Sequence, residues 1–241
     1  LTVLLGAAGL AAAADQDSLT LANAVVTVPD RSPEDRTLDA GRKPAELLAF
    51  LGIQPGWRVA DLGAGGGYTT ELLQRAVGSY GVVYGQNSPA VLKMFAEKAW
   101  SARLAKPVMK GVVRLDRDFD DPFPADLAPL DAVTIVLFYH DTVWLGANRE
   151  AMNAAVFNAL KPGGVFLIVD HSARSGDGTD VASTFHRIEE DVVKREVQAA
   201  GFVLDAEADF LRNGNDTRDW NDSPRAAGDR RGTSDRFVLR F

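Results

Sequence analysis

Short apolar runs alternate with longer segments of helical periodicity from Trp57 to the end of the chain. An apolar run of about four to eight residues is typical of a buried strand, and apolar residues spaced by a helical turn are typical of a covering helix. Strands are predicted at 58–62, 81–85, 111–115, 131–138, 164–170, 202–207 and 235–241. Helices are predicted at 68–78, 89–104, 147–160 and 181–200. This alternation favours an α/β fold with a mostly parallel sheet and helices on both faces.

Two segments precede this alternating region. Residues 15–43 are predicted to form an extended or turning arm, because Pro29 and Pro33 each bias the residue before them away from helix. A first helix is predicted to begin near Pro44, since proline is well tolerated in the first helical turn. Residues 44–241 are predicted to form one domain, which suits a chain with 46% hydrophobic and 24% charged residues.

Residues 1–14 contain no charged side chain, and the segment is shorter than the roughly 20 apolar residues that a membrane span needs. Ala12-Ala13-Ala14 before Asp15 offers the small residues of a secretory cleavage site. We interpret residues 1–14 as a signal-peptide remnant, with a short alanine-rich helix as the alternative. An export signal implies a periplasmic or secreted protein, and without one a cytoplasmic protein is expected.

The composition excludes several kinds of chemistry. The chain has no cysteine, which removes thiol nucleophiles, iron–sulfur clusters and zinc ribbons. Its 26 basic and 33 acidic residues give a net charge of −7, so nucleic acid is not expected as a partner. A small molecule is the predicted partner, without stable insertion into a membrane, and the oligomeric state is left open.

The one long stretch without apolar periodicity runs from Arg212 to Ser234. Its content of Asn, Asp, Arg and Gly predicts a surface excursion before the last strand. Trp220 within it, and Trp144, are candidates for lining an acceptor pocket, although burial in the core is the favoured interpretation for Trp144.

A glycine-rich turn, Asp61-Leu62-Gly63-Ala64-Gly65-Gly66-Gly67-Tyr68, joins the first predicted strand of the sheet to a helix. Glycines there allow the backbone to approach a ligand, and the helix N-terminus offers free N–H groups. A dinucleotide fingerprint would need a third glycine where this chain has Tyr68 or Thr70, depending on which glycines begin the count. The pyrophosphate-binding motif is therefore absent.

With its strand-end acid, this loop resembles the first motif of the class I S-adenosylmethionine-dependent methyltransferases. The resemblance covers roughly residues 36–241 and includes further motifs at the expected places. They are Lys161-Pro162-Gly163-Gly164 before the fifth strand, Ala200-Gly201-Phe202 before the sixth, and the final strand at 235–241. The resemblance implies a Rossmann-like sheet of seven strands with an antiparallel last strand, S-adenosyl-L-methionine as cofactor, and methyl transfer as the reaction.

Shorter motifs are similar to those of a group of uncharacterised bacterial predicted methyltransferases that often carry export signals. They are Arg42-Lys43-Pro44, Tyr139-His140-Asp141 and His186-Arg187-Ile188. None of these motifs identifies a substrate.

The family resemblance also implies which residues contact the cofactor. The methionine part would be held by Asp61, Gly63, Gly65 and Gly67. The family usually has Asp or Glu after the second strand to bind both ribose hydroxyls, and this chain has Asn87 there. The neutral amide of Asn87 can accept one such hydrogen bond, but the bond lacks the additional strength that a charged acceptor gives. Alternatively, Asn87 caps the helix that follows. Asp118 and Phe119 match the family's adenine contact, or else form a turn acid beside a core aromatic.

Chemistry is expected at the carboxyl ends of strands four and five, where parallel sheets bind their ligands. His140 and His171 follow these two strands, and His186 is expected early in the next helix, close to Glu189 and Glu190. A histidine with a pKa of about 6.5 can take a proton from the methyl acceptor near neutral pH. The predicted catalytic set is His140 as base or substrate contact, Asp141, Tyr139, His171 and His186.

The same side chains could hold a divalent metal, since imidazoles with Asp141 or Glu189 are reasonable ligands. Because the sequence shows no tight ligand spacing, no metal is expected. Four charged residues of the arm are predicted to face the cofactor carboxylate or the acceptor, with a solvated segment as the alternative. They are Arg36, Asp39, Arg42 and Lys43.

The predicted function is methyl transfer from S-adenosyl-L-methionine to a small-molecule acceptor. Two alternatives stay open at this point. One is an NAD(P)-binding α/β enzyme, which the missing third glycine disfavours. The other is an exported, non-catalytic binding protein with a methyltransferase fold, which Asn87 favours because it lacks the charge of the usual acid.

Overall fold

The computed structural model describes residues 18–127 and 129–241, so the predicted signal segment at 1–14 lies outside the described residues. Within the described part, seven strands form one sheet in the order β3-β2-β1-β4-β5-β7-β6. The strands are β1 (Arg58–Leu62), β2 (Val82–Asn87), β3 (Val112–Asp116), β4 (Leu130–Val136), β5 (Leu160–His171), β6 (Ala206–Ala208) and β7 (Arg236–Arg240). Six of the predicted strands are confirmed to within a few residues, whereas the sixth, predicted at 202–207, forms only at Ala206–Ala208.

The pairing of the strands is mostly parallel, as predicted. β1 pairs with β2 and β4, β2 pairs with β3, and β4 pairs with β5, all in parallel. β7 is antiparallel to both of its neighbours, β5 and β6. The strand order reverses between β1 and β4, and ligands of such sheets bind beyond the carboxyl ends of the strands at this point.

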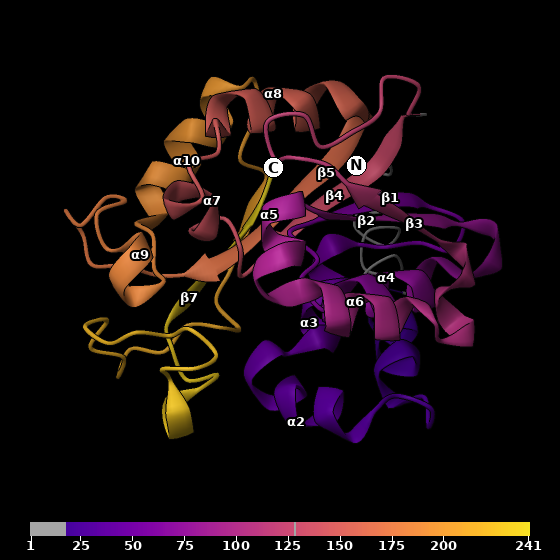
Figure 1. Ribbon diagram of the computed structural model, residues 1–241, viewed down its shortest axis with the longest axis horizontal. Helices are drawn as coiled ribbons and strands as arrows, with labels where there is room; N and C mark the ends of the chain where they lie inside the picture. Colours follow the sequence, from indigo (N-terminus) through magenta and orange to yellow (C-terminus); the bar gives the residue numbers. More distant parts are fainter. Residues whose placement is uncertain (1–17, 128) are drawn as a thin grey trace, which may run out of the picture.

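Helices cover both faces of the sheet (Figure 1). They are the segment 18–27, α2 (Pro33–Arg42), α3 (Pro44–Leu51), α4 (Tyr68–Val77), α5 (Pro89–Val91), α6 (Glu97–Leu104), α7 (Asp141–Trp144), α8 (Arg149–Ala159), α9 (Ala182–Phe185) and α10 (Glu190–Ala199). Short turns of other helix types are η1 (Gly78–Tyr80), η2 (Leu92–Ala96), η3 (Pro107–Gly111) and η4 (Gly228–Arg230). No helix of the described residues is both long and apolar enough to cross a membrane.

Two of the predicted helices are interrupted in the structure. The segment predicted as one helix at 89–104 contains the π turn η2 between α5 and α6. The segment predicted at 181–200 is divided into α9 and α10, because His186 has a positive φ of 52° that no α-helix can continue through. His186 is therefore placed by the end of a short helix, which corrects the expectation that it lies early in a longer one.

Alternate residues of the central strands face opposite layers of the core. Val59 packs with the layer that contains α3 and α4, and its neighbour Ala60 packs with the layer that contains α8 and α10. Val83 and Tyr84 divide between the two layers in the same way. Figure 1 shows α8 and α10 on the opposite side of the sheet from α3. Burial on both faces explains why the parallel strands have continuous apolar sequences.

The expectation of an extended arm at 15–43 is wrong for most of the described part, since 18–27 and α2 are helical. Pro33 lies at the start of α2, where its missing N–H costs no helical hydrogen bond. Ser32 caps this helix by accepting a hydrogen bond from the Asp35 N–H at 3.1 Å. The prolines therefore separate two helices instead of preventing them.

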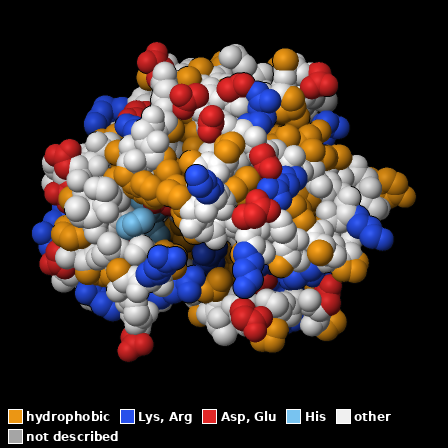
Figure 2. Space-filling model, viewed as in Figure 1, with side chains coloured by type: hydrophobic (Ala, Val, Ile, Leu, Met, Phe, Trp, Pro, Cys, Tyr) orange, Lys and Arg blue, Asp and Glu red, His pale blue; other side chains and the backbone are white. Residues whose placement is uncertain are grey.

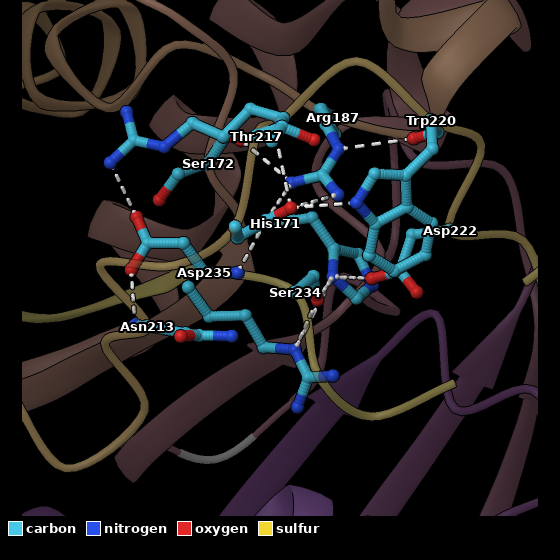
Figure 3. A network of polar contacts seen from close by, with 12 residues as sticks. His171, Ser172, Arg187, Asn213, Thr217, Trp220, Asp222, Ser234 and Asp235 are labelled. Carbon is cyan, nitrogen blue, oxygen red and sulfur yellow. Dashed lines mark hydrogen bonds and ion pairs between the residues drawn. The ribbon is translucent and has the colours of Figure 1, made fainter. Parts of the chain in front are cut away.

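The segment from Arg212 to Ser234 is irregular apart from η4, as its polar sequence predicted, but a buried ion pair ties it to the domain. Arg187, whose side chain is fully buried, donates to Asp216 at 2.7 Å. Asp216 also accepts from the Trp220 indole and from the Asp235 backbone N–H, each at 2.7 Å (Figure 3). The segment is thus fixed by one carboxylate that receives several donors.

The substitution Arg187→Met tests this anchor. It retains the apolar stem but leaves a buried carboxylate without its cation, so the free energy of unfolding should fall by about 3–5 kcal/mol in urea denaturation. The matched control is Arg174→Met, which removes an exposed pair with Asp219 and should cost about 1 kcal/mol or less. Equal losses in the two variants would contradict an anchoring role for Arg187.

Candidate active site

A cavity of about 1100 Å³ lies at the carboxyl edge of the sheet, where the strand order reverses between β1 and β4. Asp61, Gly63 and Gly65 line it on the β1 side. His140, which follows β4, and His171, the last residue of β5, also line it. Figure 2 shows a hollow in the surface, bordered by a histidine and by several basic side chains. The structure therefore brings the predicted glycine loop and the predicted histidines to one space.

The glycine loop after β1 depends on residues without side chains. Gly63, Gly65 and Gly67 have positive φ angles of 61°, 55° and 80°. A Cβ atom at Gly63 would overlap the Phe138 ring, and one at Gly67 would overlap Trp100. Gly65 is not crowded in this way and lines the cavity, so its backbone can be approached by a ligand.

Two amide side chains from the end of β2 hold this loop. Gln86 accepts a hydrogen bond from the Gly63 N–H at 3.0 Å. Asn87 accepts from the Gly65 N–H at 2.8 Å and donates to the Gly65 carbonyl at 3.2 Å. Asn87 is fully buried and does not line the cavity. Both halves of its amide are engaged by the loop, a positioning role that the sequence alone did not reveal.

The two residues matched to adenine binding lie away from the cavity wall. Asp118 is exposed, and Phe119 is buried with its ring stacked on Phe138 at a centroid distance of 5.5 Å. Neither residue lines the cavity. Phe119 packs against Phe138, whose ring borders Gly63.

Asp61 is a buried carboxylate at the cavity wall. It accepts hydrogen bonds from the hydroxyls of Thr70 at 2.6 Å and Thr134 at 2.8 Å. Burial raises the pKa of Asp61 to about 6, although these hydroxyls and the Arg42 guanidinium favour its charged form. A cationic ligand group in the cavity would complete the compensation of this charge.

Asp170, the last residue but one of β5, organises the histidine side of the cavity. Its carboxylate accepts hydrogen bonds from the backbone N–H of His140 at 2.7 Å and of His171 at 2.8 Å, and it lies 2.7 Å from Nδ1 of His140. Burial alone would lower the pKa of His140, but Asp170 and Asp141 raise it to about 10. The imidazole of His140 therefore keeps its proton at neutral pH.

His140, Asp141 and His186 meet at a single point of the cavity wall. The Nε2 atom of His140 lies 3.0 Å from Oδ1 of Asp141 and 3.2 Å from Nδ1 of His186. The same Asp141 oxygen lies 3.1 Å from Nδ1 of His186 and accepts from the Trp144 indole at 2.7 Å. Although Asp141 is buried, these donors hold its pKa well below the usual range. Trp144 is 37% exposed and lines the cavity, so its predicted burial in the core is wrong.

Glu189 and Glu190 are not partners of His186, contrary to the expectation from their spacing. Glu189 accepts hydrogen bonds from the backbone N–H groups of Gly176 and Gly178. Glu190 forms ion pairs with Lys194 and Arg212. The side chain that lies beside His186 is instead Asp141, at the start of α7.

His171 belongs to a second polar group, formed with the C-terminal segment (Figure 3). Its Nδ1 atom lies 2.5 Å from Oδ2 of Asp222 and 2.8 Å from the Ser234 hydroxyl. Burial lowers the pKa of His171 despite the acid beside it, so a neutral imidazole is expected at pH 7. Asp222 and Ser234 lie in the polar stretch that was predicted as a surface excursion, and no periodicity marks them.

Other predicted residues are placed away from the cavity. Tyr139 is buried and donates to Glu196 at 2.8 Å, which together with burial raises its pKa. Trp220 packs its ring against the guanidinium of the buried Arg187. Of the four charged arm residues, Arg42 lines the cavity, and the other three are not among its lining residues.

The chain is similar to known methyltransferases over about half of its length. Residues 60–168 match the family described as "Methyltransferase domain". The chain is 31% identical over 131 residues to trans-aconitate 2-methyltransferase from Variovorax paradoxus strain S110, a match that spans 54% of this chain and 45% of that protein.

Solved structures agree with this match. A SAM-dependent methyltransferase from Aquifex aeolicus has a TM-score of 0.61 at 16% identity, covering 87% of this chain and 92% of its own. Fibrillarin from Aeropyrum pernix with natively bound S-adenosyl-L-methionine has a TM-score of 0.54 at 15% identity, covering 84% and 76%. Residues 60–168 thus match a methyltransferase domain, and the sheet order with an antiparallel β7 is the Rossmann-like fold of S-adenosylmethionine-dependent methyltransferases.

The residues of the cavity fit the methionine part of S-adenosyl-L-methionine better than its ribose and adenine. Asp61 offers a buried carboxylate to an ammonium group, Arg42 offers a guanidinium to a carboxylate, and Gly65 leaves room for close approach. These groups suit the methionine part. Asn87, at the family's ribose position, is already bonded to Gly65 on both sides. The structure thus supports binding through the methionine part, with the loop preformed by Asn87.

The substitution Asp170→Asn tests the organisation of the histidine side. The amide N–H groups that this substitution introduces would face N–H donors that now bond to the carboxylate. The free energy of unfolding should therefore fall by about 1–3 kcal/mol. Loss of a carboxylate should also lower the pKa of His140 from about 10, measured by NMR titration of its ring signals. Asp180→Asn, which changes an exposed acid of the following loop, should alter neither quantity. An unchanged His140 pKa in Asp170→Asn would contradict this assignment.

Proposed function

We propose that the protein transfers the methyl group of S-adenosyl-L-methionine to a small, anionic acceptor. The observation that carries this proposal is the single cavity that runs from Asp61 and the glycine loop to the histidines at the carboxyl ends of β4 and β5. A cofactor bound at the first end would direct its methyl group toward an acceptor at the second. Such a displacement depends chiefly on alignment of the two reactants.

The cofactor end of the cavity would bind by charge and by shape. The cofactor supplies an electrophilic methyl group on a sulfonium centre. Asp61 would accept hydrogen bonds from its ammonium group, and Arg42 would bind its carboxylate. The preformed turn at Gly65 would let the backbone approach without rearrangement, because Gln86 and Asn87 already hold the loop.

Basic side chains and imidazoles are prominent in the lining of the cavity. Arg225, Arg231 and Arg236 line it together with His140 and His171, and the acids Asp141 and Asp222 in the same lining are paired with these two histidines. This lining favours an anionic molecule, although the chain as a whole has a net charge of −7. The relative named for methyl transfer to trans-aconitate is compatible with a carboxylate acceptor, and its match spans 45% of that relative.

The two histidines would have different roles. His140 retains its proton at neutral pH, which suits a contact to an anionic acceptor and disfavours its action as a base. His171 has a lowered pKa and lines the same cavity, so it is the neutral imidazole that could accept a proton from a hydroxyl acceptor. A carboxylate acceptor is already ionised and would need no base.

The similarity to a bacterial group with export signals, and with it a periplasmic or secreted location, stays a proposal that rests on residues 1–14. An exported, non-catalytic binding protein is the second candidate, because Asn87 replaces the usual ribose-binding acid with a loop contact.

Calorimetric titration with S-adenosyl-L-methionine and S-adenosylhomocysteine separates these functions. We expect binding of both, followed by transfer of a labelled methyl group to members of a panel of small carboxylic and hydroxy acids. His140→Ala should retain cofactor affinity and lose transfer, since His140 lies at the acceptor end. Binding without transfer to any acceptor would favour the binding-protein alternative, and absence of binding would exclude both.

The pKa of Asp61 predicts how cofactor affinity depends on pH. Only the charged carboxylate attracts an ammonium group, so affinity should rise from pH 5 to pH 7 as Asp61 ionises with a pKa of about 6. Asp61→Asn should bind about tenfold more weakly at pH 7.5 and show no such rise. A pH profile that Asp61→Asn leaves unchanged would contradict this role.

The raised pKa of Asp61 also makes the stability of the unliganded protein depend on pH. The folded pKa of Asp61 lies above its ordinary value of 3.8, so the folded state binds the proton more tightly over this range. The contribution of Asp61 to stability therefore falls as the pH rises from 3.8 through about 6. Asp61→Asn should remove this part of the pH dependence in urea denaturation.

A further inference from the structure

Three metal-ligating atoms converge at the wall of the cavity. Among the described residues, His140, Asp141 and His186 form a group whose donor atoms all lie within 4.8 Å of one another. The closest donors are Nε2 of His140, Oδ1 of Asp141 and Nδ1 of His186, separated by 3.0, 3.1 and 3.2 Å. They come from two segments 45 residues apart, the end of β4 with α7 and the end of α9.

These separations form a nearly equilateral triangle. A single ion can lie about 2.1 Å from all three corners of such a triangle, with angles of about 95° between ligands. That is one face of an octahedron. A tetrahedral ion at the same distance would need its ligands about 3.4 Å apart. Two imidazoles and a carboxylate on one octahedral face are a known ligand set for first-row transition metals, whereas Mg²⁺ and Ca²⁺ prefer oxygen ligands.

Neighbouring residues and the local backbone hold each of the three ligand side chains in position. Asp170, itself fully buried, lies 2.7 Å from Nδ1 of His140 and so turns Nε2 toward the other two donors. The Trp144 indole donates to Oδ1 of Asp141 at 2.7 Å. His186 is held at a positive φ of 52°, a conformation that non-glycine residues adopt at a cost of about 1–2 kcal/mol. The backbone is thus strained where it directs this imidazole to the group.

We propose that His140, Asp141 and His186 bind one divalent transition-metal ion as a facial triad, and that its remaining positions face the acceptor. Binding of the ion would displace to solvent the proton that Nε2 of His140 carries in the metal-free protein. All three residues line the cavity, so an ion on their open side would be exposed to a bound small molecule. Carboxylate or hydroxyl oxygens of an anionic acceptor would occupy those positions. The site goes beyond the proposed methyl transfer, because ion binding requires neither the cofactor nor the acceptor.

Titration of Co²⁺ into the full chain after treatment with EDTA tests the site directly. We expect one ion per chain and the weak visible absorption of six-coordinate Co²⁺. His186→Ala removes a ligand that is partly exposed, so it should fold normally while losing affinity by about 100-fold or more. Asp141→Asn provides a second ligand change with nearly unchanged volume and should also lose affinity.

The matched control is His171→Gln, which removes a neighbouring imidazole whose ring centroid is 5.5 Å from that of His140. This variant should bind Co²⁺ as the unmodified chain does. Asp170→Asn should retain six-coordinate Co²⁺ but bind it about 10- to 100-fold more weakly, because it positions His140 without contacting the ion.

Absence of Co²⁺ binding in the unmodified chain would overturn the proposal, as would intense four-coordinate absorption. Equal affinity in His186→Ala, or an equal loss in His171→Gln, would overturn the assignment of the three ligands. These results are independent of methyl transfer. A chain that binds Co²⁺ but not S-adenosyl-L-methionine would refute the proposed function and leave the metal site intact. A chain that binds S-adenosyl-L-methionine but not Co²⁺ would refute the metal site and leave the proposed function intact.

Discussion

The chemistry of the cavity depends on the carboxylate of Asp170. Buried at the end of β5, it accepts hydrogen bonds from two backbone N–H groups and lies against the ring of His140. Because β4 and β5 are parallel neighbours, this one side chain joins the ends of both strands and places His140 and His171 at one edge. A buried carboxylate is stable only when donors surround it, so the geometry of the two histidines follows from satisfying this charge.

The opposite side of the cavity follows a different constraint. The glycine loop needs positive φ angles and space against Phe138 and Trp100, which only glycine provides at Gly63 and Gly67. Neutral amides at the end of β2, including Asn87, then bond to the loop backbone. An acid at this position could not donate to the Gly65 carbonyl. Asn87 thus stabilises the glycine loop in one conformation, but it cannot offer a charged carboxylate to a ribose.

The polar segment from Arg212 to Ser234 completes the cavity and is joined to the domain by buried charged groups. Its composition predicted correctly that it lacks regular structure apart from a short turn. It did not indicate that Asp216 would bind a fully buried Arg187, or that Asp222 would lie against His171. A buried charge is satisfied by partners that are distant in sequence, and the spacing of polar residues carries no record of them.

The sequence by itself determined most of the strands, the glycine loop and the presence of histidines at the carboxyl ends of β4 and β5, because periodicity and glycine sterics act over a few neighbouring residues. It misplaced the break before α10 and with it His186, whose backbone is held by tertiary contacts in a conformation that helical periodicity does not encode. Only the tertiary structure decided that His186 meets His140 and Asp141 within 3.2 Å. That meeting depends on how α9 packs against α7, and packing between separate elements is set by the whole fold.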